Sequence, residues 1–252
     1  MIRLAVLLLL LALPVRAEEV IAGLSQNRVS ITANFDGSEI LIFGAVKREA
    51  PIPEETGPLE VVITVAGPSV PVMVRRKAKR YGIWVNTDAV EVDRAPSFYA
   101  VATSGPFNLI LKDIEDLRHK ISIERAIRSV GAPMTIADAG NFTEALIRIR
   151  RDEDLYQIRP NTVLVTEETL FQTSVALPAN LTEGDYLARF FLTRGGNVID
   201  AFETKIFVKK VGLERFLYTL AHERPLIYGI LSLAIAIAAG WGASAVFRYL
   251  RS

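Results

Sequence analysis

The chain has 252 residues, and its 29 lysines and arginines nearly balance its 28 aspartates and glutamates, which gives a formal net charge of +1. This balance argues against a nucleic-acid-binding protein, whose surface would be strongly basic. The sequence contains no cysteine, which excludes disulfides, thiolate catalysis, iron–sulfur clusters and cysteine-bound zinc.

The first 17 residues have the layout of a secretory signal peptide. Arg3 gives a positive start, an apolar run covers residues 4–13, and the small residues Val15 and Ala17 precede a cleavage site. Ten apolar residues span about 15 Å, which is too short for a bilayer. We therefore expect cleavage after Ala17, with Glu18 as the first mature residue. The alternative is an uncleaved N-terminal anchor.

Residues 18–111 form a β-rich stretch in which short apolar runs alternate with turn residues. The runs predict strands at residues 29–33, 39–46, 59–66, 70–74, 81–85 and 98–103. We expect the first two strands to pair as a hairpin, with Phe35 beneath it. Short strands with turn signals about every 8–12 residues are typical of an immunoglobulin-like sandwich.

Residues 112–158 change to a helical period. Ile114, Leu117 and Ile121 share one face of a helix that is predicted over residues 112–130. Asn141 is expected to cap a second helix, because its side-chain oxygen can accept from the first free N–H groups. The sequence therefore predicts a helical insertion between two β-rich stretches.

A second β-rich part follows at residues 159–212. Its apolar runs predict strands at residues 162–166, 170–177, 185–193 and 197–208. Gly195 and Gly196 predict a tight hairpin between the last two strands, since both tolerate positive φ. Tyr186 stands near a corner, as in fibronectin- and immunoglobulin-like modules. The predicted fold class is mainly β, with immunoglobulin-like sandwich regions, a helical insertion and one C-terminal transmembrane helix.

The C-terminal part predicts a membrane anchor. Residues 225–247 carry no charge, and their length of about 34 Å is enough to cross a bilayer. Arg248 and Arg251 lie in the tail that follows, which the positive-inside rule assigns to the cytoplasm. Residues 213–224 predict an amphipathic helix at the membrane interface, and the alternative is a last core helix of the exported domain.

Small side chains recur every four residues along the predicted membrane helix, at Ser232, Ala236, Gly240 and Ser244. Such a stripe lets a second helix approach closely, although small residues are also common in isolated anchors. The predicted partners are membrane lipid and either another integral membrane protein or a second copy of this chain. Nucleic acid is not an expected partner.

Five cations occupy six positions in the first β-rich stretch: Arg75, Arg76, Lys77, Lys79 and Arg80. The flanking strand patterns place these cations at a hairpin or a strand edge. One interpretation is an anion- or partner-binding site for a lipid headgroup, an acidic partner or an oxyanion, with Tyr81 and Trp84 available for stacking. The alternative is a charged edge that prevents aggregation between strands.

The sequence indicates no catalytic, cofactor-binding or metal-binding residues. The two histidines, His119 and His222, lie far apart, and a metal site needs three or four ligands. Asp152, Glu153 and Asp154 lack the glycine and the terminal glutamate of a calcium loop. We therefore expect a protein that is not an enzyme and that uses no cofactor.

An ordered set of short segments resembles a known family. The segments are Arg75-Arg76-Lys77, Gly82 to Asn86, Pro96 to Ala102, Leu170-Phe171, Leu177-Pro178-Ala179, Gly184-Asp185-Tyr186 and Lys210 to Glu214. Together they are similar to an uncharacterised family of alphaproteobacterial transmembrane proteins, over nearly the whole mature chain. The resemblance implies a Gram-negative inner membrane and periplasm. It brings no activity and no functional residues.

These patterns divide the chain into a signal peptide (1–17), a β-rich domain (18–111), a helical segment (112–158), a second β-rich part (159–212), an amphipathic juxtamembrane helix (213–224), a transmembrane helix (225–247) and a cytoplasmic tail (248–252). The expected function is that of a single-pass inner-membrane protein whose periplasmic domain is a binding or accessory module for a membrane or envelope complex. The alternatives are a membrane-anchored enzyme whose site the sequence does not reveal, and a structural envelope protein.

Overall fold

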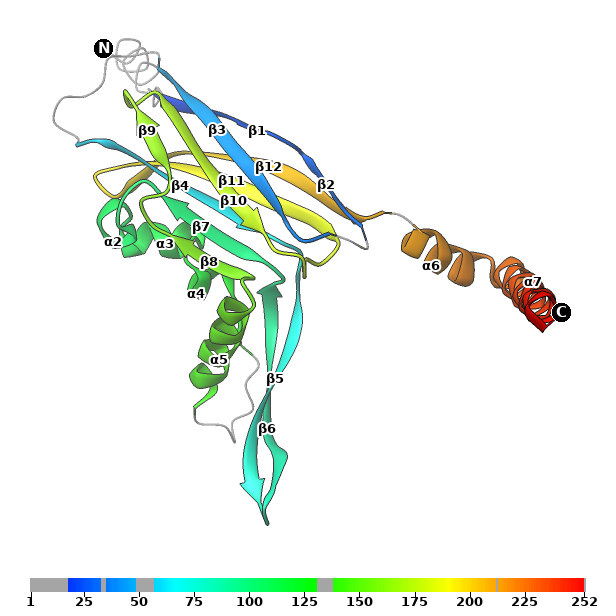
Figure 1. The fold of residues 1–252 in the computed structure, drawn as a ribbon. Coiled ribbons are helices and arrows are strands. Elements are labelled where there is room, and N and C mark those ends of the chain that lie inside the picture. Colours follow the sequence, from blue (N-terminus) through cyan, green and yellow to red (C-terminus); the bar gives the residue numbers. More distant parts are fainter. Residues whose placement is uncertain (1–17, 33–34, 49–56, 131–137, 212, 252) are drawn as a thin grey trace, which may run out of the picture. The chain divides into compact units, whose positions relative to one another are not determined.

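A computed structural model describes residues 18–32, 35–48, 57–130, 138–211 and 213–251 (Figure 1). The predicted signal peptide lies outside the described residues. The chain forms two compact units. One holds the residues up to Val29 and Asp36–Val208, and the other holds Ser30–Phe35 and Lys209–Ser252.

The first unit is built on two β-sheets that face each other (Figure 1). The four-stranded sheet has the order β1 (Glu18–Leu24), β3 (Ser38–Arg48), β10 (Leu170–Leu177) and β9 (Leu164–Thr166). The six-stranded sheet has the order β2 (Arg28–Ile31), β12 (Asn197–Lys210), β11 (Gly184–Arg194), β4 (Leu59–Ala66), β7 (Tyr99–Thr103) and β8 (Tyr156–Arg159). Strands β7 and β8 are parallel.

Apolar side chains from both sheets form the core between them. Ile40 and Ile42 point inward from β3, and the Phe171 ring of β10 lies 6.2 Å from the Phe190 ring of β11. The two predicted β-rich stretches share both sheets, since β3 pairs with β10 and β4 pairs with β11. They therefore form one sandwich rather than two. The mainly β fold class is confirmed, and the immunoglobulin-like assignment stays a prediction.

Most strand predictions agree with the structure, but the first predicted hairpin is wrong. Strand β3 pairs with β1 and β10, whereas β2 belongs to the other sheet. The alternation of buried side chains in β2 and β3 fixes which face of each strand is apolar, but it does not select the neighbouring strand. The hairpin at Gly195 and Gly196 is confirmed, with φ values of +57° and +79°.

Strands β5 (Ser69–Arg80) and β6 (Ile83–Pro96) form a separate two-stranded ribbon. Both strands are much longer than the predicted segments 70–74 and 81–85. Most of the side chains of the ribbon are exposed, so apolar residues do not alternate with polar ones along it. The sequence pattern that detects a half-buried strand is therefore missing here.

The helical insertion contains α2 (Phe107–Ile110), α3 (Asp113–His119), α4 (Ile123–Ala126) and α5 (Ala139–Asp152). The single helix predicted over residues 112–130 is wrong. Lys120 ends α3 in the left-handed conformation, with φ of +53°, and the Asp116 carboxylate accepts hydrogen bonds from the Ile121 and Ser122 amides. The chain therefore turns at a point where the apolar periodicity continues.

The predicted cap of the next helix is also wrong. Helix α5 begins at Ala139, so Asn141 lies within its first turn, and Asp138 is at the N-cap position. The Asn141 amide donates to the Asp138 carboxylate at 3.2 Å. Phe142 and Leu146 of α5 are buried, whereas Ile149 is exposed.

Short helices cover the outer face of the six-stranded sheet beside β4 and β7 (Figure 1). The Tyr99 hydroxyl of β7 donates to the Ile121 carbonyl oxygen at 2.8 Å, and the Lys112 amide donates to the Gly196 carbonyl oxygen at 2.9 Å. As a result β4 and β7 are buried on both faces. The ribbon of β5 and β6 therefore continues from two strands that are themselves buried.

The second unit contains α6 (Leu213–Glu223) and α7 (Pro225–Arg251). The bounds of α6 match the predicted juxtamembrane helix, and Pro225 lies at the start of α7, where its missing N–H costs nothing. The segment Pro225–Ser244 is long and apolar enough to span a bilayer. The single predicted transmembrane helix is therefore present at the C-terminal end.

A buried cluster of charges joins the two sheets at one end of the sandwich. The Glu18 carboxylate of β1 accepts hydrogen bonds from Arg48 of β3 at 2.8 Å and from Arg194 of β11 at 2.9 Å. Arg194 also contacts the Glu168 carboxylate at 3.2 Å. Burial alone raises the pKa of Glu18, but the hydrogen bonds and charges of Arg48 and Arg194 outweigh it, so the pKa lies below its ordinary value.

This cluster predicts a pH-dependent contribution of Glu18 to stability. Glu18→Gln leaves Arg48 and Arg194 with only the Glu168 carboxylate as a shared counter-charge, so we expect the free energy of unfolding at pH 7 to fall by about 3 kcal/mol. Because the folded-state pKa is lowered, the stabilisation is present above the ordinary value of 4.5 and is lost as the pH falls through the folded-state value. Thermal unfolding at pH 7 and at pH 3 measures the difference.

The matched control is Glu19→Gln, which removes the same charge at the neighbouring, exposed position. It should change the free energy of unfolding by less than about 1 kcal/mol. Equal effects of the two substitutions on the free energy of unfolding at pH 7 would show that the Glu18 cluster contributes no more to stability than an exposed charge does.

Candidate functional site

The ribbon of β5 and β6 is a direct continuation of the β4–β7 pair. Between the two pairs, the Gly67 amide donates to the Phe98 carbonyl oxygen at 2.8 Å, and the Ser97 amide donates to the Pro68 carbonyl oxygen at 2.9 Å. A Cβ atom on Gly67 would lie 2.6 Å from the Ser97 hydroxyl, so glycine is required for this close approach. We call the ribbon Ser69–Pro96 the arm.

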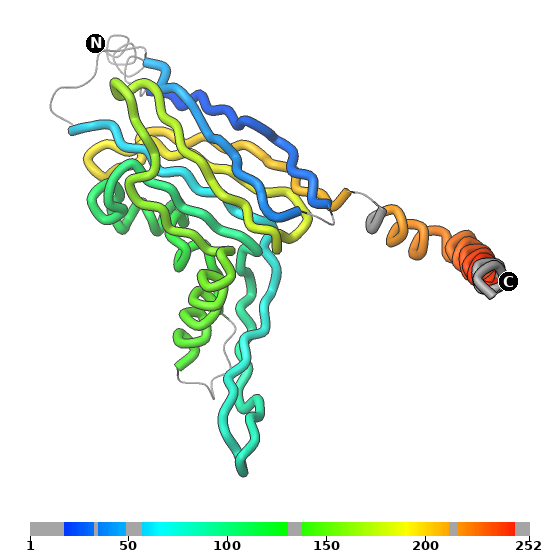
Figure 2. Tube along the Cα trace, in the orientation of Figure 1, coloured from blue at the N-terminus to red at the C-terminus, as the bar shows by residue number. Residues whose placement is uncertain are grey.

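The arm extends beyond the two sheets, and α5 lies beside the part nearest to them (Figures 1 and 2). Its base is fixed by Tyr156, whose hydroxyl donates to the Pro96 carbonyl oxygen at 2.7 Å. Twelve residues of β5 correspond to a length of about 40 Å. A two-stranded ribbon of this length is rarely stable by itself, so the buried base and α5 have to support it.

The sequence-predicted cations all lie on the distal half of the arm. Arg75 stands opposite Ala89, Lys79 opposite Trp84 and Arg80 opposite Ile83, and a register shift follows Arg76. The candidate site residues therefore all lie on one two-stranded ribbon, as expected for a hairpin: Arg75, Arg76, Lys77, Lys79, Arg80 and Trp84. Whether they bind an anion stays a prediction.

The end of the arm exposes large apolar side chains together with cations. The exposed fractions are 106% for Tyr81, 65% for Ile83 and 69% for Trp84. Among the described residues, Lys77, Lys79 and Arg80 have no ion-pair partner. We call this group of residues the tip: Lys77, Lys79, Arg80, Tyr81, Ile83 and Trp84.

Arg76 differs from the cations of the tip because it forms ion pairs with Asp88 and Asp138. Its guanidinium donates to Asp88 at 2.9 Å and to Asp138 at 2.5 Å, and it lies 5.0 Å from the centre of the Phe142 ring. The hydrogen bond with Asp138 raises the pKa of Arg76 and lowers the pKa of Asp138. Arg76 therefore connects the arm to α5, and its charge is already neutralised.

The turn at the end of the arm holds a bulky residue in an unfavourable conformation. Tyr81 has φ of +49° and Gly82 has φ of +89°, so both central residues of the two-residue turn are left-handed. Glycine adopts this conformation freely and asparagine does so readily, whereas an aromatic residue there is uncommon. Tyr81 thus lies at the extreme end of the arm. Its left-handed backbone conformation destabilises the turn to some extent.

Sequence reasoning missed the partners of Arg76 and one residue of the tip. Asp138 lies 62 positions from Arg76, so no local spacing indicates the pair. Ile83 could have been found, because recognising Tyr81 and Gly82 as a turn places Ile83 opposite Arg80.

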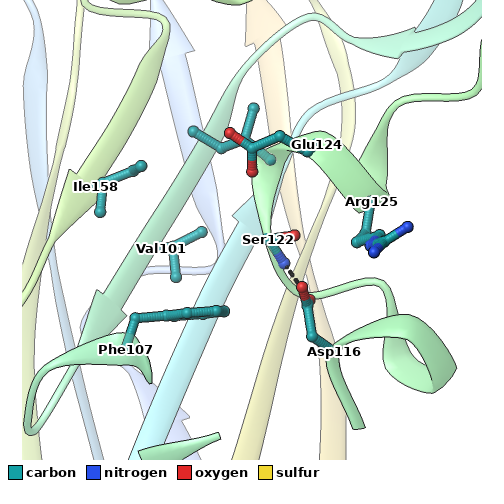
Figure 3. Close-up of a pocket in the computed structure, with 8 residues that line it drawn as sticks. Val101, Phe107, Asp116, Ser122, Glu124, Arg125 and Ile158 are labelled. Atoms are coloured by element: carbon teal, nitrogen blue, oxygen red, sulfur yellow. Dashed lines mark hydrogen bonds between the residues drawn. The ribbon is translucent and has the colours of Figure 1, made fainter. Parts of the chain in front are cut away.

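A cavity of about 400 Å³ lies beside the short helices (Figure 3). Val101, Phe107 and Ile158 line its apolar side. Asp116 lies on another side, where its carboxylate already accepts the Ser122 amide at 2.7 Å. This carboxylate holds the turn between α3 and α4, which is a structural role.

The outer face of the four-stranded sheet has a second, larger hollow of about 570 Å³. Exposed apolar side chains surround it, among them Ile21, Phe43 and Leu170. Its lining has no charged residue, so it offers packing area but no electrostatic selectivity.

Both histidines make local contacts within the parts that the structure describes. His119 lies 3.5 Å from the Glu115 carboxylate, and its ring is 5.5 Å from that of Phe191. His222 stacks on Tyr218 at 4.0 Å. No group of three or more potential metal ligands comes together in the described ranges.

The stripe on α7 presents an open surface. The Ser232 hydroxyl donates to the Tyr228 carbonyl oxygen at 2.8 Å, so it is satisfied within its own helix. Nothing lies within 4 Å of the place where a Cβ atom would stand on Gly240. Packing of Ser232, Ala236, Gly240 and Ser244 on a second helix stays a prediction.

The connection between Arg76 and α5 predicts a local change in the arm. Asp138→Asn removes the charge that holds Arg76, so amide hydrogen exchange in β5 and β6 should become faster. Thermal unfolding should barely change, because this ion pair is exposed to solvent. Asp152→Asn, at the other end of α5, is the control and should leave exchange in the arm unchanged. Unaltered exchange in Asp138→Asn would mean that this ion pair does not restrain the arm.

Comparison with known proteins identifies the family. A family model described as "Putative transmembrane protein (Alph_Pro_TM)" matches residues 19–249. No curated protein matches the chain. The match includes the arm, both sheets and nearly all of α7, and it confirms the resemblance in the sequence. The chain therefore belongs to this alphaproteobacterial family of transmembrane proteins.

Proposed function

We propose that this protein is a single-pass inner-membrane protein whose periplasmic domain is a binding or accessory module of a membrane or envelope complex, and that it is not an enzyme. The observation that carries the proposal is the arm. A rigid sandwich supports a long ribbon whose end exposes aromatic and cationic side chains, and such exposed groups are typical of a contact surface. The sandwich and the short helices provide the support for this ribbon.

The orientation rests on charge and on the predicted signal peptide. Arg248 and Arg251 follow the apolar segment, which favours a cytoplasmic C-terminus. A signal peptide that is cleaved after Ala17 would direct export of the domain and leave Glu18 as its first residue. In the folded domain the Glu18 side chain is buried, so a mature chain that starts there keeps its interaction with Arg194.

The cavity near Asp116 gives little support to the enzyme alternative. The Asp116 carboxylate accepts from two backbone amides, at 3.0 Å and 2.7 Å, and Val101, Phe107 and Ile158 supply an apolar lining. These groups suit packing better than proton transfer. The small-residue stripe of α7 adds a second possible contact, with another integral membrane protein or a second copy.

The proposed orientation predicts the activity of reporter fusions. A reporter that is active only in the periplasm should be active when it is fused near Gly212 and inactive when it is fused after Ser252. The reverse pattern would contradict the orientation.

Mass spectrometry of the extracted protein should find Glu18 at its N-terminus.

The binding role of the arm predicts position-specific crosslinking in cells. A photoreactive amino acid at position 84 or 83 of the full chain should give crosslinked products under ultraviolet light. The control is position 109 on α2, since Leu109 is also an exposed apolar residue, at 72%. It should give none. Crosslinking that is absent at the tip, or equally strong at position 109, would contradict the proposed function.

A further inference from the structure

We propose that the tip of the arm is a second membrane contact, which enters the headgroup layer of a bilayer containing anionic phospholipid. The inference rests on the proposed function, because it names what the arm binds. The protein would then contact lipid in two places, through the spanning helix α7 and through a tip that is more than 140 residues earlier in the sequence.

The charge along the arm is divided between its two ends. The acidic residues of the arm are Asp88, which stands opposite Arg76, and Glu91 and Asp93, which lie nearer to the sheets. Beyond Asp88 the arm carries only cations, and Arg76 alone among them is neutralised by ion pairs in the described residues. The tip therefore presents unpaired positive charge, which is complementary to lipid phosphate groups.

The apolar side chains of the tip are those that favour a membrane interface. Tryptophan and tyrosine are enriched at the level of the headgroups, because each combines an apolar ring with a polar group. Trp84 and Tyr81 provide both, and Ile83 adds an aliphatic side chain. A charged edge that only prevents aggregation would not need exposed tryptophan and isoleucine. The composition of the tip therefore favours a lipid contact over edge protection.

The two faces of the ribbon have the same chemistry at the tip. Neighbouring residues of a strand point to opposite faces, so the Lys79–Trp84 pair lies on one face and the Arg80–Ile83 pair on the other. Each face thus combines one cation with one apolar side chain. A groove on a partner protein contacts mainly one face, whereas a headgroup layer surrounds an inserted tip on all sides. This symmetry favours a bilayer over an acidic protein partner.

The conformation of Tyr81 agrees with this geometry. Its left-handed backbone places a fully exposed aromatic ring at the extreme end of the arm, which is the first part to meet a bilayer. Asparagine would suit the turn better. The substitution Tyr81→Asn therefore removes the ring without weakening the ribbon, which separates a binding role from a folding role.

The test uses full-length protein in lipid nanodiscs, with fluorescence of Trp84 as the readout. The substitution Trp241→Phe in α7 leaves Trp84 as the single tryptophan. The discs contain either phosphatidylcholine alone or phosphatidylcholine with about one third phosphatidylglycerol. Nitroxide-labelled lipid is placed in the same disc, or in added vesicles of the same composition, so that contact with either bilayer is detected.

With phosphatidylglycerol we expect the Trp84 emission to shift to shorter wavelength and to be quenched by the nitroxide lipid. Both effects should be absent with phosphatidylcholine alone, and they should weaken as salt is added. The triple substitution Lys77→Gln, Lys79→Gln and Arg80→Gln neutralises the tip. It should lower the affinity for added vesicles, measured by quenching, about 100-fold, because each cation contributes about fivefold to the binding constant. Tyr81→Asn should also weaken it.

The matched control neutralises three exposed cations elsewhere, by Arg125→Gln, Arg148→Gln and Lys205→Gln. It removes the same total charge and should bind like the parent protein. The melting temperatures of all variants should agree, since the altered side chains are exposed.

Absence of quenching with phosphatidylglycerol in both arrangements would overturn the inference. So would equal weakening by the control variant, or binding by the neutralised tip at the parent level. If the tip crosslinks to an acidic protein in cells but Trp84 is not quenched by discs or vesicles that contain anionic lipid, the inference fails and the proposed binding function of the arm stands. If position 84 crosslinks to nothing in cells and Trp84 is not quenched, both fail.

Discussion

The antiparallel pairing of β4 with β7 is the constraint on which the rest of the sandwich and its arm depends. These two strands are neighbours within the six-stranded sheet, neither of them at its edge, with the sandwich core on one side and the short helices on the other. Their ladder continues through the hydrogen bonds at Gly67 and Ser97 into the arm. The arm is therefore connected by hydrogen bonds to the buried part of the sheet, although most of its own side chains face solvent.

The surroundings of each cation decide its role. Arg194 is buried and joins the two sheets through Glu18, where loss of its counter-charge would be costly. Arg76 is exposed but connects the arm to α5 through Asp138. Lys79 and Arg80 have no such partner in the described part of the chain, so their charge remains available for a ligand. The same residue types thus have different surroundings, and different contacts, at different distances from the core.

Two features relate the protein to a membrane by independent physics. Helix α7 partitions into lipid because its apolar segment is long enough to span the hydrocarbon layer. The tip has no such length, and its affinity would come from charge and from interfacial aromatic rings. The first contact is permanent, whereas the second would depend on lipid composition and salt. A protein with both could respond to the state of the membrane that holds it.

The sequence by itself determined the local features: the apolar span of α7, the amphipathic α6, most strands, and the glycine hairpin at Gly195 and Gly196. Each follows from the periodicity or the conformational freedom of neighbouring residues. Only the tertiary structure decided which strands pair, where the helix after residue 112 breaks, and that Arg76 meets Asp138. Those outcomes depend on contacts between distant residues, and a local pattern fixes the buried face of an element without naming what covers it.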